Sequence, residues 1–150
     1  MPLDGVYDQS PEQWVRDQVA LYERTGGAEG NTLRDRGLPI AVFTMRKRRN
    51  GHLRKVPLMR VEHDGRYALV ASKGGAPQHP VWYYNLLEHP EIEVQDGPAP
   101  FDARVRELHG DERTEWWERA VAAYPDYADY QKRTDREIPV FLAEPVQPAA

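Results

Sequence analysis

Short runs of apolar residues recur along the chain between turn-forming residues, a pattern typical of β-strands. Six such runs are rich in β-branched or aromatic residues or alternate between apolar and polar positions: 39–44, 56–62, 67–72, 92–95, 101–108 and 138–142. The Asp64-Gly65 pair between the second and third runs favours a tight hairpin turn. Because hairpins make neighbouring strands antiparallel and a barrel leaves no exposed edge, we predict an α+β fold, an antiparallel β-barrel with flanking helices.

The first part of the chain shows helical spacing instead. Ser10 can cap a helix whose first position is Pro11, and Gly26 with its neighbouring glycine predicts the helix end. The glycine-rich stretch that follows is expected to be a flexible connector. We therefore divide the chain into an N-terminal helix with a flexible connector, residues 1–37, and a barrel domain, residues 38–150. Two further helices are expected, one over residues 80–89 and one that Asp111 caps and that runs through Val121.

The composition excludes several classes of protein. The chain has no cysteine, which rules out a disulfide scaffold, thiolate metal ligands and a cysteine nucleophile. No stretch approaches the roughly 18 uninterrupted apolar residues of a membrane-spanning helix. The first residues lack a signal-peptide pattern, and the five histidines show no paired spacing, so we expect a cytoplasmic protein without a metal site.

Positive charge is concentrated in one segment of an otherwise acidic chain. Residues 46–60 hold seven basic side chains and no acidic one, which leaves 13 basic against 24 acidic residues elsewhere. The Asn50-Gly51 pair lets this segment turn, and several cations around one turn can hold phosphate or carboxylate groups. The alternatives are a solvated basic loop and a nonspecific nucleic-acid or membrane surface. Nucleic acid is disfavoured by the net charge of -4 and by the lack of a recognisable binding module.

Two further clusters have chemical potential. The Ser-Lys-Gly-Gly sequence of residues 72–75 places a hydroxyl, a cation and two glycines at the end of a predicted strand, where backbone N–H groups can approach a ligand closely. A plain turn is the alternative. Tyr124, Tyr127 and Tyr130 would share one helix face and could stack on a planar substrate while donating hydrogen bonds or a proton. Core packing is the alternative for these rings.

Three longer strings carry a family resemblance. They are Arg-Lys-Val-Pro-Leu at residues 54–58, the stretch from Ala-Ser-Lys-Gly-Gly to Trp-Tyr-Tyr-Asn-Leu at residues 71–86, and Tyr-Pro-Asp-Tyr-Ala-Asp-Tyr-Gln at residues 124–131. In these strings the chain resembles the deazaflavin (F420)-dependent nitroreductase and F420-dependent quinone reductase family. The resemblance implies a split β-barrel related to flavin-binding oxidoreductases. It also implies hydride transfer from reduced coenzyme F420 to a small electron-poor acceptor, which is a quinone, an enone or unsaturated lactone, or a nitro compound.

The same resemblance implies a set of site residues. Basic residues would hold the phosphate and oligoglutamate tail of the cofactor, and the glycine-containing turn would wrap its ring and ribityl chain. The implied cofactor-binding residues are Arg48, Arg49, Arg54, Lys55, Val56, Pro57, Leu58, Met59, Ala71, Ser72, Lys73, Gly74, Gly75, Ala76, Pro77, Trp82 and Asn85. The predicted catalytic residues are Ser72, Tyr124, Tyr127 and Tyr130.

Two positions depart from the family pattern, and other functions stay open. Lys47 stands where the family commonly has glycine, and Met59 stands where nitroreducing members can carry tyrosine, which leaves reduction of bulky nitroimidazoles open. The alternative functions are an FMN-dependent split-barrel oxidoreductase and a non-catalytic F420-binding or storage protein. The helix around Trp14 could cover the substrate or make peripheral contact with the inner face of the cell membrane, with packing on the barrel as the alternative. The sequence does not indicate an oligomeric state.

Overall fold

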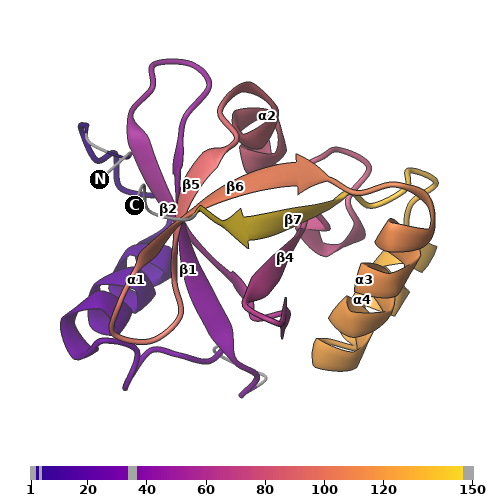
Figure 1. Ribbon diagram of the computed structural model, residues 1–150, viewed down its shortest axis with the longest axis horizontal. Coiled ribbons are helices and arrows are strands. Elements are labelled where there is room, and N and C mark those ends of the chain that lie inside the picture. The colour runs from indigo at the N-terminus through magenta and orange to yellow at the C-terminus, as the bar shows by residue number, and fades with distance from the viewer. Residues whose placement is uncertain (1–2, 4, 34–36, 147–150) are drawn as a thin grey trace.

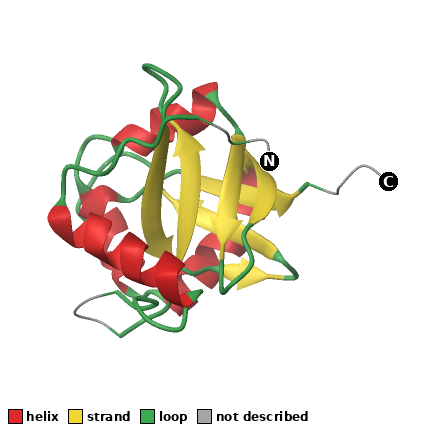
Figure 2. Cartoon of the chain, turned by 90° about the vertical axis from the view of Figure 1, so that its left-hand side faces the viewer, coloured by secondary structure: helices red, strands yellow, loops and turns green. Residues whose placement is uncertain are grey.

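One antiparallel sheet forms the centre of the protein (Figures 1 and 2). The computed structural model describes residues 3, 5–33 and 37–146. In this part of the chain the sheet has seven strands in the order β2-β1-β5-β6-β7-β4-β3, so β2 and β3 are its edges. The strands are β1 (Ile40–Arg46), β2 (Leu53–Met59), β3 (Glu62–His63), β4 (Arg66–Val70), β5 (Glu91–Gln95), β6 (Phe101–Glu107) and β7 (Val140–Pro145).

The helices lie around this curled sheet. Figure 1 shows α1 on one side of the molecule, α3 and α4 together on the other, and α2 near the ends of β5 and β6. The described helices are α1 (Gln13–Thr25), α2 (Val81–Glu88), α3 (Gly110–Ala123) and α4 (Asp126–Lys132), with one 3-10 turn, η1 (Lys73–Gly75). The predicted α+β split-barrel architecture is confirmed.

Both faces of strand β1 are buried. In β1, Phe43 and Met45 belong to one apolar cluster, whereas Ile40 and Val42 belong to a second cluster on the opposite face. Successive side chains of a strand point to opposite faces, so a strand with two covered faces must be apolar throughout. This explains why residues 39–44 form a continuous apolar run rather than an alternating one.

The helices supply the second cluster with its largest side chains. Val19 and Tyr22 of α1 and Trp116 and Ala120 of α3 pack there against the outer face of the sheet. Trp116 is only 1% exposed, and full burial of a large apolar side chain stabilises a fold by about 1.5–3 kcal/mol. The N-terminal helix therefore shares a core with the barrel strands.

The predicted hairpin at Asp64-Gly65 is confirmed, but the strand before it is shorter than expected. Both turn residues have positive φ, 54° and 77°, as a two-residue turn of this hand requires. The single strand predicted over residues 56–62 is instead two strands, β2 and β3. The chain bends at Arg60, whose backbone N–H donates to Pro39 and whose guanidinium pairs with Asp96 at 2.8 Å.

The N-terminal helix begins slightly later than predicted. It starts at Gln13, and Ser10 accepts the N–H of Glu12 at 3.2 Å in the preceding turn. Its end at Gly26 is confirmed, because this residue adopts the left-handed conformation with φ 61°. The glycine-rich connector is hydrogen-bonded to the helix, since the Gln18 amide donates to the carbonyls of Gly30 and Thr32 at 3.0 and 2.7 Å.

The domain boundary between residues 37 and 38 stays a prediction. Parts of both predicted regions, residues 1–2, 4, 34–36 and 147–150, lie outside the described residues. In the described part of the chain, no helix is long and apolar enough to cross a membrane.

Candidate functional site

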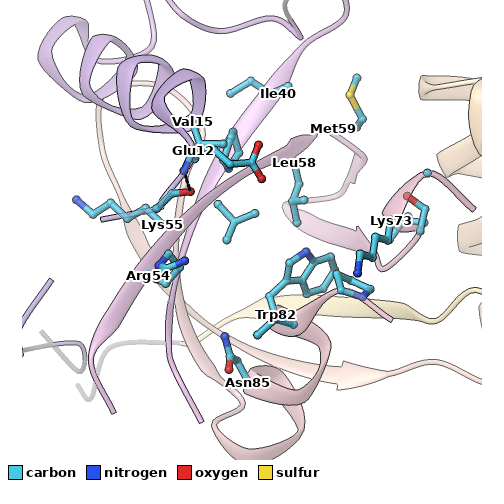
Figure 3. Close-up of a pocket in the computed structure, with 18 of the residues that line it drawn as sticks. Glu12, Val15, Ile40, Arg54, Lys55, Leu58, Met59, Lys73, Trp82 and Asn85 are labelled. Carbon is cyan, nitrogen blue, oxygen red and sulfur yellow. Dashed lines mark hydrogen bonds between the residues drawn. The ribbon is translucent and has the colours of Figure 1, made fainter. Parts of the chain in front are cut away.

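A cleft of about 1050 Å³ lies between α1, the edge strand β2, α2 and α4. This volume is at the upper end of the range of about 300–1,000 Å³ that is usual for small-molecule sites. Figure 3 shows Arg54 and Lys55 on one side of the cleft and Lys73 and Met59 on the other, with Trp82 between them. Every predicted site residue lines this cleft except Ala71, Gly75, Ala76 and Pro77.

The edge strand β2 forms the longest wall of the cleft. Its residues from Arg54 to Met59 all line the space, and Val56 and Leu58 also pack against the inner core. Pro57 pairs in register with Val42 of β1 on one side only. Proline lacks a backbone N–H, and an edge strand tolerates this because its outer side needs no partner.

The basic turn between β1 and β2 closes one end of the cleft. Gly51 adopts a φ of 73°, and backbone hydrogen bonds between Lys47 and both His52 and Gly51 tie the turn together. The backbone N–H of Arg48 donates to the Asn85 side chain of α2 at 2.9 Å. Asn85 is thus a cleft residue that also positions the basic turn.

The Ser-Lys-Gly-Gly turn closes the opposite end of the cleft. Ser72, Lys73 and Gly74 line the space, and Lys73 and Gly74 have φ values of 46° and 64°. Gly75 faces away, against α4: a Cβ added there would lie 2.5 Å from the carbonyl oxygen of Tyr130. The two glycines therefore have different roles. Gly74 leaves open space beside the cleft, whereas Gly75 permits close contact with the backbone of α4.

Arg136 holds this turn in place, a role that the sequence reasoning missed. Its guanidinium donates to the carbonyls of Ala71, Ser72 and Ala76 at 3.2, 2.7 and 2.9 Å. It also lies 3.0 Å from Nδ1 of His79. Burial and the nearby Arg136 charge lower the pKa of His79, which favours a neutral ring that accepts this contact. Arg136 lies five residues beyond the family-like string of residues 124–131, and only the fold brings it to the turn.

The three tyrosines line the cleft, but they do not share one helix as predicted. Helix α3 ends at Ala123, and Tyr127 and Tyr130 belong to the separate helix α4. The hydroxyls of Tyr124 and Tyr130 lie 2.9 Å apart, and the rings of Tyr124 and Tyr127 meet edge-on at 4.9 Å. Tyr124 and Tyr127 belong to the hydrophobic core and also line the cleft. These two rings therefore combine core packing with a place in the wall of the candidate site.

The hydroxyls of these tyrosines differ in their surroundings. Burial raises the pKa of Tyr127, and burial together with the Tyr130 hydroxyl raises the pKa of Tyr124. Both phenols therefore stay protonated at neutral pH and can donate hydrogen bonds. Tyr127 is only 4% exposed, whereas Tyr130 is partly exposed. Tyr130 is the most exposed residue of the three.

The N-terminal helix supplies a wall that the predicted site residues did not include. Trp14, Val15 and Gln18 of α1 line the cleft, together with Leu33 of the connector. The Trp14 indole donates to Glu12 at 2.6 Å. The apolar positions of the helix were visible in the sequence, but nothing local indicated that they face a cleft. Among the described residues, no group of three or more His, Cys, Asp or Glu could hold a metal ion.

Comparisons with known proteins identify the family of the chain. The profile of the F420H(2)-dependent quinone reductase family matches residues 14–145. The chain belongs to this family. An F420H(2)-dependent quinone reductase of Mycobacterium tuberculosis is 31% identical over 133 residues, which is 87% of this chain and 89% of that protein. The chain is thus an F420H2-dependent oxidoreductase, and the predicted family, enzyme class and cofactor are confirmed.

Two solved structures are similar to this family member. A structure described as an F420-H2 dependent reductase is 54% identical, with a TM-score of 0.68, and the match covers 75% of this chain and 98% of the other. A structure described as a domain-swapped dimer is 51% identical, with a TM-score of 0.70, and the match covers 90% of this chain and 100% of the other. The fold extends further, since the heme storage protein HutZ of Vibrio cholerae has a TM-score of 0.53 at 9% identity over 89% of this chain and 92% of the other.

The residues of the cleft fit the cofactor that the family name implies. F420 combines a flat ring with a phosphate and a carboxylate-bearing tail. The cleft offers apolar walls from Val56, Leu58 and Trp82, and its basic end carries Arg48 and Arg54. A Cβ added at Gly74 would meet nothing within 4 Å, so a ligand can come close to the backbone there.

Proposed function

We propose that the protein binds reduced F420 along the cleft and reduces a quinone or another electron-poor acceptor, an enone, unsaturated lactone or nitro compound, beside the tyrosines. The observation that carries this proposal is that one continuous cleft joins a cationic end, an apolar middle and a tyrosine cluster. The cofactor, when bound, supplies the hydride. The chain's own residues then need only to bind, orient and stabilise charge.

The basic end would hold the anionic tail of the cofactor. Arg48, Arg49, Arg54 and Lys55 all line this end of the cleft. A unit-charge pair at 4 Å is worth about 4 kcal/mol at a surface-like dielectric, before desolvation is subtracted. Several such contacts would hold a polyanion firmly and in a salt-dependent manner.

The tyrosine end would bind the acceptor. Hydride addition to a quinone leaves negative charge on an oxygen, and one proton then completes the hydroquinone. The hydroxyl of the partly exposed Tyr130 would donate a hydrogen bond to that oxygen, supported by the Tyr124 hydroxyl at 2.9 Å. Ser72, in the turn that closes the end of the cleft opposite the basic turn, would hydrogen-bond an oxygen of the cofactor or acceptor.

Membrane contact through the N-terminal helix stays a prediction. Trp14 and Val15 line the cleft, which supports a role for α1 in covering the bound acceptor. Flotation of the protein with anionic lipid vesicles tests the membrane alternative directly.

Titration with F420 tests the proposed function. Oxidised and reduced F420 should both bind tightly and less so at high salt, and menadione should then oxidise the bound F420H2 in a catalytic manner. Preferential binding of flavin mononucleotide in a parallel titration would favour the FMN-dependent alternative. Tight F420 binding without turnover of quinones, enones or nitro compounds would favour storage.

We further propose that α1 can be exchanged between two copies of the chain, so that each cleft is completed by its partner's Trp14 and Val15. The relative described as a domain-swapped dimer supports this, as does the glycine-rich connector after Thr25. Two inactive variants, Trp14→Ala/Val15→Ala and Arg54→Ala/Lys55→Ala, should complement each other after co-refolding. If chains pair at random, half of the dimers contain one chain of each variant. In each of these dimers one cleft combines the two unaltered parts and the other combines the two altered parts, so about one quarter of all clefts would be intact. No recovered activity would mean that each chain completes its own cleft.

A further inference from the structure

The N-terminal segment lies against the basic turn as an added piece of strand. The backbone N–H of Asp8 donates to the carbonyl of Leu53 at 2.8 Å, and the N–H of Leu53 donates to Val6 at 2.7 Å. Tyr7 and Leu53 form a parallel bridge between these bonds. Because the backbone is held on both sides of Tyr7, the carboxylate of Asp8 has a defined position beside the start of β2.

Asp8 contacts three of the basic groups in residues 46–60. Its Oδ2 lies 2.9 Å from Nζ of Lys47 and 3.0 Å from Nδ1 of His52. Its backbone carbonyl accepts a hydrogen bond from Nε of Arg54 at 3.0 Å. Hydrogen bonds from Lys47 and then His52 lower the pKa of Asp8, so this carboxylate is ionised at neutral pH.

A second acid approaches the same basic surface from α1. The carboxylate of Glu23 pairs with Nζ of Lys55, and that ammonium also lies 4.9 Å from the ring centre of Tyr7. Lys47 and Lys55 both line the cleft. The cluster of positive charge seen in the sequence is therefore partly neutralised in the folded chain by two acids from the N-terminal segment.

We propose that Asp8 and Glu23 act as internal counter-anions that determine the affinity and specificity of the basic end for anionic ligands. A ligand anion at Lys47 or Lys55 must share the cation with, or replace, an acid that is already there. A polyanion without a ring contacts only the basic end, so its binding free energy is reduced by the whole cost of displacing the acid from its cation. A ligand that also fills the apolar middle of the cleft offsets that cost through the burial of its apolar surface.

The two carboxylates thus disfavour phosphate-rich molecules that lack a ring. This inference rests on the proposed function only in treating the basic end as a binding site for anions. It assigns Asp8 and Glu23 to specificity and does not place them in hydride transfer.

Isothermal titration calorimetry with inorganic tripolyphosphate, at low and at raised salt, measures the affinity of the basic end for a polyanion that has no ring. The Asp8→Asn/Glu23→Gln variant should bind tripolyphosphate about three- to tenfold more tightly than the wild type at low salt, since partly exposed ion pairs are individually weak. The gain should shrink as salt screens the surface. The single variant Asp8→Asn should show part of the gain.

A matched variant controls for net charge. Asp17→Asn/Glu29→Gln removes the same two charges from exposed acids of the same segment and should leave tripolyphosphate affinity within about twofold of the wild type. Unchanged or weaker binding by Asp8→Asn/Glu23→Gln would overturn the proposal, and weaker binding would mean that the acids organise the basic turn instead. A parallel titration of the wild type with F420 tests the proposed function separately from the role of Asp8 and Glu23. If F420 does not bind, while Asp8→Asn/Glu23→Gln still binds tripolyphosphate more tightly than the wild type, only the proposed function is rejected.

Discussion

Replacement of Gly75 with alanine is expected to lower the free energy of unfolding by about 2–4 kcal/mol, through backbone strain and overpacking together. The residue has a φ of 82°, which an L-residue with a side chain adopts at a cost. The new methyl group would also lie 2.5 Å from the carbonyl oxygen of Tyr130 and 3.0 Å from its Cα. These are backbone atoms of α4, so the methyl group cannot be accommodated by a side-chain rotation.

Gly74→Ala is the matched control for this prediction. Gly74 has a similar φ of 64°, but a Cβ there would meet nothing within 4 Å. Its replacement should cost about 1 kcal/mol, the backbone contribution alone. Urea unfolding followed by tryptophan fluorescence measures both values. Equal losses in the two variants would show that contact with α4 carries no cost. We also expect Gly75→Ala to reduce turnover, because the same contact positions Tyr130 relative to Ser72.

Replacement of Tyr130 with phenylalanine is expected to lower kcat with menadione by about 10- to 100-fold while leaving the F420 dissociation constant within about twofold. The hydroxyl would donate to the oxygen on which charge develops, a contact that matters more in the transition state than in the bound ground state. The loss should be smaller than for a sole proton donor, because the Tyr124 hydroxyl lies 2.9 Å away and can partly substitute.

Tyr127→Phe provides the comparison on the same helix. Its hydroxyl is buried, so we expect a clearly smaller change in kcat than for Tyr130→Phe. Steady-state kinetics with menadione and fluorescence titration of F420 separate turnover from binding. A larger kcat loss in Tyr127→Phe would assign the donor role to the buried hydroxyl. Unchanged turnover in a variant with all three tyrosines replaced would remove the cluster from catalysis.

Local sequence patterns predicted the secondary structure correctly where the conformation depends on one interaction between neighbouring residues. Asp64-Gly65 defined a hairpin because few residue pairs accept positive φ twice in succession. The strand prediction failed at Arg60, where the bend depends on hydrogen bonds to Pro39 and Asp96 from distant parts of the chain. The helix predicted from Asp111 through Val121 is confirmed, but the three tyrosines do not share one helix, because the chain turns between Ala123 and Asp126.

The family-like strings located most of the cleft, but not the residues that support it. Residues 54–59 and 72–74, which belong to the predicted cofactor-binding set, line the cleft, and their role in cofactor binding stays a prediction. Arg136 supports the turn from 64 residues beyond Ser72, and nothing in its neighbourhood along the chain marks that contact. Trp14 and Gln18 were not among the predicted site residues, and covering of the substrate by their helix was only one of three alternatives, since helical spacing shows that a face is apolar without showing what it covers.

Most strands, the hairpin, the basic turn and the family could be predicted from the sequence, because each depends on neighbouring residues or on a contiguous string. The charges that remain available for a ligand, and the glycine that contacts α4, depend instead on how distant segments pack together. The electrostatics of residues 46–60 depend on Asp8 and Glu23, which reach Lys47 and Lys55 through the docking of the N-terminal segment on β2. Charge interactions follow distance in space rather than along the chain, so a cluster of one sign in the sequence is partly balanced once the chain folds.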